Sequence, residues 1–196
     1  MTMNVAWGES PEGVTFFIQL NEQGFVKYAY EIDHDTDGDS TDEWWFEYDA
    51  QGRLITMKRT EGNNEVTTVT YDAAGNISRI DMKSDPDPEN PYDKTSMWAT
   101  TEYTDSRYGS MIANIGGIML YDETFRIDMD EMAPAFYAGI LGRATTSLPV
   151  RTVEDDGYVY TFTWTLNGSG LPGQFDRESK NADGNPESTD HIDFVW

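Results

Sequence analysis

A short sequence occurs twice in this chain, as YDAQGRL at residues 48–54 and as YDAAGNI at residues 71–77. In the first copy Asp49 is followed three residues later by Gly52, and the second copy keeps both residue types at the same spacing. The aspartate favours a type I turn, because its side chain can accept hydrogen bonds from the backbone of the turn. The glycine supplies the positive φ with which the chain re-enters a strand. The repeat therefore predicts two β-hairpins of the same kind.

Looser copies of this pattern lie upstream, at residues 20–26, and downstream, at residues 166–171. Any protein made of antiparallel strands collects turns of this type. Two nearly identical copies at hairpin spacing nevertheless indicate a repeated hairpin unit. The pattern identifies an architecture and no chemistry.

Alternation of apolar and polar residues predicts strands around these turns. It is clearest over residues 158–166, where four aromatic residues and a leucine occupy every second position. Three shorter segments show the same alternation, at residues 14–20, 26–32 and 44–48. In the second of these, the pattern places Tyr28 and Tyr30 on the apolar face and Glu31 on the opposite face.

One segment, residues 129–141, departs from the period of two. Its apolar side chains recur at helical spacing, and Gly142 follows as a stop signal. Asp128 and Glu131 resemble a capping box, and Pro134 fits if the regular helix begins close to it. The segment therefore predicts one short amphipathic helix that covers an end or a face of the sheet.

Together these patterns predict an all-β fold. We expect a large curved antiparallel sheet, or a barrel-like meander of hairpins, with one short amphipathic helix. The 196 residues are enough for one domain with a core, and no linker separates the repeats. The prediction is therefore a single β-rich domain over residues 1–196.

The chain is strongly acidic. It has 36 Asp and Glu against 13 Lys and Arg, for a net charge of −23. Such a charge repels nucleic acid and anionic membrane surfaces. The absence of cysteine excludes disulfides, cysteine nucleophiles and thiolate metal sites. No apolar run is long enough to span a bilayer and no signal peptide is present, so we expect either a cytosolic protein or one whose leader lies outside this chain.

An acidic segment resembles the first half of a calcium-binding loop. The candidate ligands are Asp33, Asp35, Asp37 and Asp39. Gly38 lies where such a loop turns sharply, but the twelfth position holds Trp44 in place of the expected glutamate. Calcium is therefore a possible cofactor, and the alternative is a solvated acidic hairpin tip.

Four tryptophans are candidates for an aromatic platform that stacks on sugar rings. They are Trp44, Trp45, Trp98 and Trp164. The alternative is that most of them are core residues or cross-strand pairs. Because Trp44 and Trp45 are adjacent in a predicted strand, they point to opposite faces, and one of them is exposed unless both faces are covered.

No catalytic motif is present. The two histidines, His34 and His191, do not have zinc-site spacing, and there is no Gly-x-Ser-x-Gly elbow. A carboxylate pair for glycoside hydrolysis is arguable anywhere in a chain with 36 acidic residues, so the acidic residues single out no site. We predict a protein that is not an enzyme.

The order of motifs resembles a family of Bacteroidetes envelope proteins with a porin-like antiparallel sheet, and the paired turns resemble the YD repeat. The resemblance rests on residues 48–54, 71–77, 114–118, 139–143, 147–149, 158–166 and 170–172. It implies a secreted or lipid-anchored protein of the cell envelope with no assigned activity or ligand, and the anchor, in the second case, would lie outside this chain.

The leading hypothesis is a non-catalytic surface protein that binds an extracellular glycan or a protein partner. The alternative is a structural envelope module with calcium-stabilised loops, and the third is a hydrolase of the glycosidase type.

Overall fold

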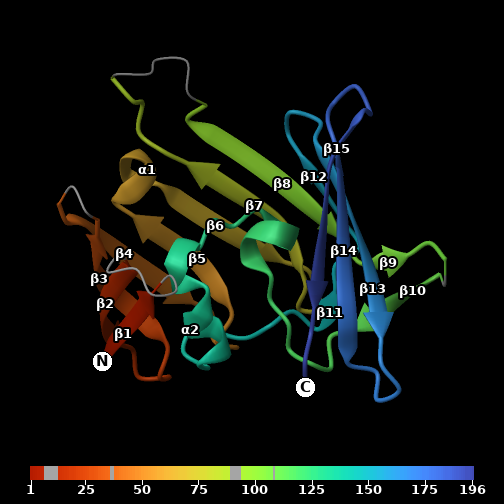
Figure 1. Ribbon diagram of the computed structural model, residues 1–196, viewed down its shortest axis with the longest axis horizontal. Coiled ribbons are helices and arrows are strands. Elements are labelled where there is room, and N and C mark those ends of the chain that lie inside the picture. The colour runs from red at the N-terminus through yellow and green to blue at the C-terminus, as the bar shows by residue number, and fades with distance from the viewer. Residues whose placement is uncertain (7–12, 36–37, 89–93, 108) are drawn as a thin grey trace. The chain divides into compact units, whose positions relative to one another are not determined.

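The computed structural model describes residues 1–6, 13–35, 38–88, 94–107 and 109–196 (Figure 1). Its strands are β1 (Thr2–Ala6), β2 (Gly13–Leu20), β3 (Val26–His34), β4 (Ser40–Tyr48), β5 (Leu54–Arg59), β6 (Val66–Tyr71), β7 (Ile77–Lys83), β8 (Ser96–Glu102), β9 (Thr104–Asp105), β10 (Ser110–Ala113), β11 (Ser147–Leu148), β12 (Arg151–Glu154), β13 (Val159–Leu166), β14 (Pro172–Lys180) and β15 (Pro186–Asp193). The helical elements are α1 (Glu61–Asn64), the π-helix η1 (Tyr121–Phe125), the 3₁₀ helix η2 (Asp130–Met132) and α2 (Pro134–Tyr137).

The predicted all-β, antiparallel meander is confirmed. Within the described ranges, twelve strands are hydrogen-bonded in the order β1 to β8 followed by β12 to β15, and β9, β10 and β11 form a separate small sheet. The strands from β1 to β6, β8 with β12, and the strands from β12 to β15 pair in antiparallel fashion. In the part of the chain that the structure describes, none of the helical elements is both long and apolar enough to cross a membrane.

The chain divides into two compact units, and each is built from three separate segments. The first unit contains residues 1–68, 82–96 and 129–143, and the second contains residues 69–81, 97–128 and 144–196. The single domain remains a prediction. The two units are described separately below.

Both copies of the repeated turn have the predicted geometry. The Asp49 carboxylate accepts hydrogen bonds from the backbone N–H groups of Gln51 and Arg53, at 2.9 and 3.0 Å. Gly52 follows with φ = 78°. Asp72 holds its own turn in the same way. The same pattern of contacts, with an asparagine in place of the aspartate, recurs in the turns that begin at Asn21, Asn167 and Asn181. The predicted repeat therefore extends to five hairpins.

In the first unit, alternate side chains of β2 and β4 form a core on one face of the strands. Phe16 and Trp44 are fully buried there, and Trp44 stacks on Phe46 with ring centroids 6.1 Å apart. The predicted apolar faces of these two strands are therefore confirmed. Their other face points away from the core.

The prediction for β3 was wrong about which face is buried. Ala29 and Glu31 lie in the core, whereas Tyr28 and Tyr30 lie on the opposite, outer face. The register of β3 shifts at its turn, where Leu20 pairs with Val26 but Gln19 pairs with Tyr28. This irregularity makes Val26 buried although the tyrosines are not. A glutamate is tolerated in the core because its carboxylate accepts a hydrogen bond from Trp44 Nε1.

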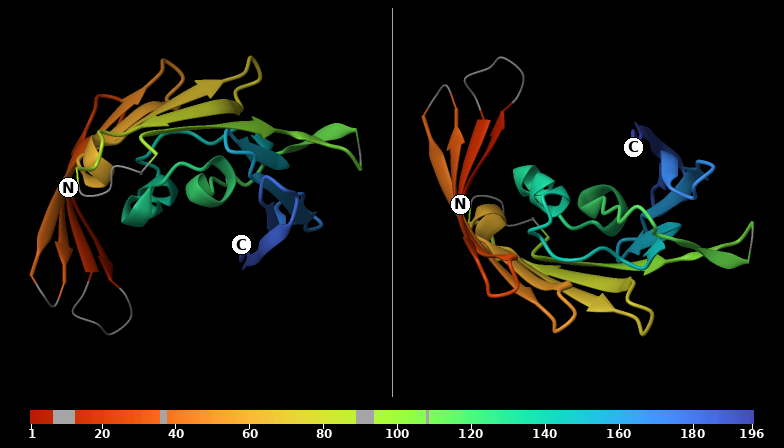
Figure 2. Two further views of the ribbon diagram at one scale, coloured as in Figure 1. Left: turned by 90° about the horizontal axis from the view of Figure 1, so that it is seen from above. Right: turned by 90° about the horizontal axis from the view of Figure 1, so that it is seen from below.

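The segment 129–143 lies beside the strands of the first unit (Figure 2). The Val26 N–H donates to the carbonyl of Ile140 at 2.7 Å. The predicted short helix is present as α2, with Pro134 in its first turn. It ends earlier than predicted, at Tyr137. Gly139 follows with φ = 78°, and the N–H groups of Gly139 and Ile140 donate to the carbonyls of Phe136 and Ala135. The predicted capping box is absent, because no side chain caps η2 or α2.

The second unit has a core on one face of β13 and β14. Tyr160, Phe162 and Trp164 alternate into it, as predicted, and Phe175 lies against Trp164 with ring centroids 4.7 Å apart. The strands β13, β14 and β15 lie side by side (Figure 1). The indole N–H of Trp164 donates to the carbonyl of Pro149 at 2.7 Å.

Two turn glycines provide a matched test of this geometry. Gly24 and Gly52 both have positive φ, but an added Cβ at Gly24 meets nothing within 4 Å, whereas at Gly52 it lies 2.7 Å from the Phe25 ring. Gly24→Ala should cost about 1 kcal/mol of unfolding free energy, from backbone strain alone. Gly52→Ala should cost about 1–3 kcal/mol more, because the ring must move. Urea unfolding measures both, and equal losses would contradict the assigned contact.

Candidate functional site

The outer face of the first unit carries a row of aromatic side chains. We call Phe17, Tyr30, Tyr28 and Trp45 the aromatic stripe. Phe17 on β2 is paired with Tyr30 on β3, and Tyr28 on β3 is paired with Trp45 on β4. Residues paired in this way have neighbouring side chains on the same face of a sheet. The stripe therefore follows from strand register.

Its rings are close to one another and open to solvent. The ring centroids are 6.5 Å apart for Phe17 and Tyr30 and 5.8 Å apart for Tyr28 and Trp45. Phe17 is 47% exposed and Trp45 is 39% exposed. Aromatic surface left in water on neighbouring strands is a feature of binding surfaces.

A hollow of about 340 Å³ lies beside Trp45. Its other lining residues are Glu47, Thr56 and Lys58. Lys58 is paired with Trp45 and Thr56 with Glu47 across β4 and β5, so all four belong to the outer face. The hollow thus combines an aromatic ring with a carboxylate, a hydroxyl and an ammonium group.

Tyr28 is held in place beside Trp45, with which it is paired across β3 and β4. Its hydroxyl donates to Glu43 Oε1 at 2.6 Å, and this hydrogen bond raises the pKa of Tyr28. The backbone N–H of Glu43 donates in turn to Thr60 Oγ1 at 2.9 Å. The Tyr28 ring is therefore positioned before any ligand arrives.

Two of the four predicted platform residues lie in the cores. Trp44 has no exposed surface, and Trp164 is only 6% exposed. Both also use their indole N–H groups internally, with Glu31 and with Pro149. These two rings are buried or nearly so, and the four tryptophans therefore do not form one exposed platform. The prediction that Trp44 and Trp45 point to opposite faces is confirmed.

Trp98 on β8 is 36% exposed, close to the value for Trp45. Its surroundings differ, because the guanidinium carbon of Arg79 lies 4.6 Å from the centroid of its ring. Arg79 is itself held by an ion pair, in which its Nη2 lies 2.6 Å from Asp81 Oδ1. A face of Trp98 is thus already engaged by a cation.

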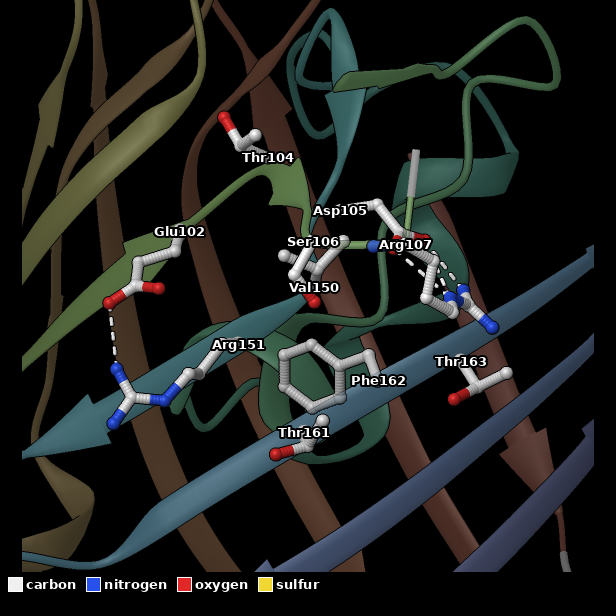
Figure 3. A pocket seen from close by; sticks show the side chains of 10 residues that line it. All are labelled: Glu102, Thr104, Asp105, Ser106, Arg107, Val150, Arg151, Thr161, Phe162 and Thr163. Atoms are coloured by element: carbon white, nitrogen blue, oxygen red, sulfur yellow. Dashed lines mark hydrogen bonds and ion pairs between the residues drawn. The ribbon is translucent and has the colours of Figure 1, made fainter. Parts of the chain in front are cut away.

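The second unit contains a different hollow, of about 330 Å³ (Figure 3). Its arginines lie in ion pairs: Arg107 Nη2 is 2.6 Å from Asp105, and Arg151 Nη1 is 2.7 Å from Glu102. The hydrogen bond from Arg107 lowers the pKa of Asp105. Phe162 lines this hollow, but its side chain belongs to the core. The hollow therefore offers no exposed aromatic face.

The acidic segment is only partly described, since Asp37 lies outside the described residues. Asp33 ends the pairing of β3 with β4, and Asp39 accepts a contact from His34 Nδ1 at 3.2 Å. Asp35 is exposed. Within the described ranges, no three His, Asp or Glu side chains are arranged to hold a metal ion. The calcium site remains a prediction.

A buried ion network lies on the core side of the first unit. Arg59 is 5% exposed, and its guanidinium donates to Asp130 and also to Glu61 and Glu65, each at 3.3 Å. The same group lies 5.4 Å from the centroid of the Trp44 ring. The network ties η2 to the strands.

Burial raises the pKa of Glu31 to about 7, and the negative charges of Asp42, Glu131 and Asp130 add to this effect. The pKa of Glu61 is raised to about 7 by burial and by Asp130. Carboxyl groups with such values can serve as general acids when a substrate reaches them. Glu31 instead lies in the core, where its carboxyl group accepts a hydrogen bond from Trp44 Nε1. This arrangement is that of a structural carboxyl group.

Sequence reasoning found Trp45 but missed its partners on the outer face. Tyr28 and Tyr30 occupy alternate positions typical of a core face, so their pattern predicts burial, and the signal that assigns them to the outer face is the register shift after the turn at Asn21. Phe17 lies opposite the predicted apolar face of residues 14–20, and only strand pairing brings it beside Tyr30. Lys58 and Thr56 carry no local signal at all, because only cross-strand pairing brings them to Trp45.

The fold and the stripe define an antiparallel β-meander protein with an exposed aromatic face. The chain belongs to the family described as a domain of unknown function (DUF4595) with porin-like fold, whose model matches residues 8–173. Among solved structures, it is similar to a porin-like protein from Bacteroides uniformis ATCC 8492, with 18% identity and a TM-score of 0.46. That alignment covers 99% of this chain and 95% of the other. No curated protein matches the chain. The predicted porin-like family is confirmed, while the YD repeat and the lipid anchor stay predictions.

The raised pKa of Glu31 predicts a pH-dependent stability. The group titrates at 4.5 in the reference state and at about 7 in the folded protein, so its contribution is fully present below pH 4.5 and is lost as the pH rises through 7. Glu31→Gln should therefore stabilise the protein by roughly 3 kcal/mol at about pH 8 and by little below pH 4.5. Urea unfolding across this range tests it.

The matched control is Glu47→Gln on the exposed face of β4, which should keep the wild-type profile. A Glu31→Gln variant that loses stability equally at every pH would contradict the assignment, because a loss that does not vary with pH does not come from the titration of Glu31.

Proposed function

We infer that this protein is a non-catalytic glycan-binding protein that is secreted or displayed on the cell envelope. The observation that carries the inference is the exposed pair of Tyr28 and Trp45 beside the hollow of Glu47, Thr56 and Lys58. Sugar rings have apolar faces that stack on aromatic rings, and their hydroxyls need polar partners at the rim. The hollow supplies both within one rigid surface of paired strands.

The size of the hollow also supports a small ring-shaped ligand. Its volume, about 340 Å³, lies at the lower end of ligand sites in general. The positions of its side chains are set by strand pairing and by the hydrogen bond between Tyr28 and Glu43. Such preorganisation reduces the entropy cost of binding.

A protein partner is the alternative for the same face, since exposed aromatic side chains also form protein interfaces. The polar rim favours the glycan. Glu43, Glu47 and Lys58 stand around the rings, so the apolar area is narrow and interrupted by charges. The location in the envelope rests on the resemblance of the motif order and is part of the proposal.

The first experiment is a glycan array probed with the tagged protein, followed by titration of each bound sugar with tryptophan emission as the readout. Trp45→Ala should weaken binding by at least about tenfold, the loss of one stacked ring. Trp98→Ala is the control, because this tryptophan is equally exposed but engaged by Arg79, and it should bind as the wild type does.

Two outcomes would overturn the proposal. If no glycan on the array binds the protein, glycan binding is contradicted, and a protein partner becomes the leading ligand for the stripe. Binding that survives Trp45→Ala but is lost in Trp98→Ala places the sugar elsewhere on the protein.

A further inference from the structure

The aromatic stripe is longer than the hollow beside Trp45. It begins at Phe17 on β2, crosses β3 through Tyr30 and Tyr28, and ends at Trp45 on β4. Neighbouring strands are about 4.8 Å apart, and residues on one face of a strand repeat every 6.8 Å or so. The stripe therefore runs obliquely over roughly 12 Å, which is more than one ring-shaped ligand would cover.

Uncharged polar groups flank the stripe, in addition to the charged Glu43, Glu47 and Lys58. The outer positions that flank it include Thr15, Gln19, Thr41 and Thr56. Hydroxyl and amide groups both donate and accept hydrogen bonds, as sugar hydroxyls do. These residues supply matching partners along the length of the stripe.

The charged groups at the Trp45 end disfavour an anionic ligand. Glu43 and Glu47 on β4 repel an anion, and the net charge of −23 adds to this repulsion. Lys58, directly across the strands from Trp45, is one positive charge against these. A neutral oligosaccharide avoids this cost, which an acidic one would meet.

We propose that the ligand of the aromatic stripe is an uncharged oligosaccharide of several units that lies from Trp45 to Phe17. This inference rests on the proposed function and adds the charge and the length of the ligand. One unit occupies the hollow against Trp45, and the following units stack on Tyr28, Tyr30 and Phe17. The carboxylate of Glu47 accepts hydrogen bonds from hydroxyls of the first unit.

Calorimetric titration with neutral gluco-, manno- and xylo-oligosaccharides of two and six units tests the proposal, with oligogalacturonate of six units as the anionic probe. At least one neutral hexasaccharide should bind about tenfold more tightly than its disaccharide, and the anionic probe should bind at least about tenfold more weakly than that hexasaccharide. Phe17→Thr and Tyr30→Thr should remove the gain from length, so that each variant binds the hexasaccharide no more tightly than the disaccharide. Threonine is chosen because it keeps the strand preference, and thermal unfolding checks that both variants fold.

The outcomes separate this inference from the proposed function. Binding that depends on Trp45 but is equal for two and six units, or that prefers the anionic probe, overturns the inference and leaves glycan binding in place. If no probe in the panel or on the array binds in a manner that depends on Trp45, both are overturned.

Discussion

The turn formed by an aspartate or asparagine and a later glycine is the constraint on which the other features depend. In five hairpins the side chain at the first position accepts two backbone N–H groups, and a glycine with positive φ returns the chain to its strand. A one-residue change of register moves every side chain of a strand to the other face. The irregular pairing after Asn21 therefore decides that Tyr28 and Tyr30 are available for binding and that Glu31 is not.

The cost of placing Glu31 in the core is reduced by one hydrogen bond. Its carboxylate accepts from Trp44, and the Trp44 ring lies beside the Arg59 guanidinium. Arg59 in turn holds Asp130, so the segment that carries η2 is tied to the strands by charge as well as by apolar contacts. Removing one member of such a buried network leaves an uncompensated group. The network fixes the inner face of the first unit, and with it the orientation of the outer face.

Local features were predictable because their causes are local. The turns at residues 48–54 and 71–77, the strand at 158–166 and the position of Pro134 all follow from contacts between residues a few positions apart. The capping box at Asp128 and Glu131 was not formed, since the chain there adopts a 3₁₀ turn in which Asp130 bonds Arg59 instead. The four tryptophans looked alike in sequence, and only burial distinguishes Trp45 and Trp98 from the two in the cores.

The sequence by itself determined the antiparallel hairpins, their turns and the fact that Trp44 and Trp45 face opposite ways, because alternation and turn chemistry act within a few residues. Only the tertiary structure decided which of those two faces is covered. The segment 129–143 is held to the strands by the hydrogen bond from Arg59 to Asp130. These two residues are 71 positions apart, and no local pattern encodes so distant a contact. The candidate site was likewise decided by the tertiary structure. Its residues come from four strands and meet only when the register between these strands is set; they include Phe17, Tyr28, Trp45 and Lys58.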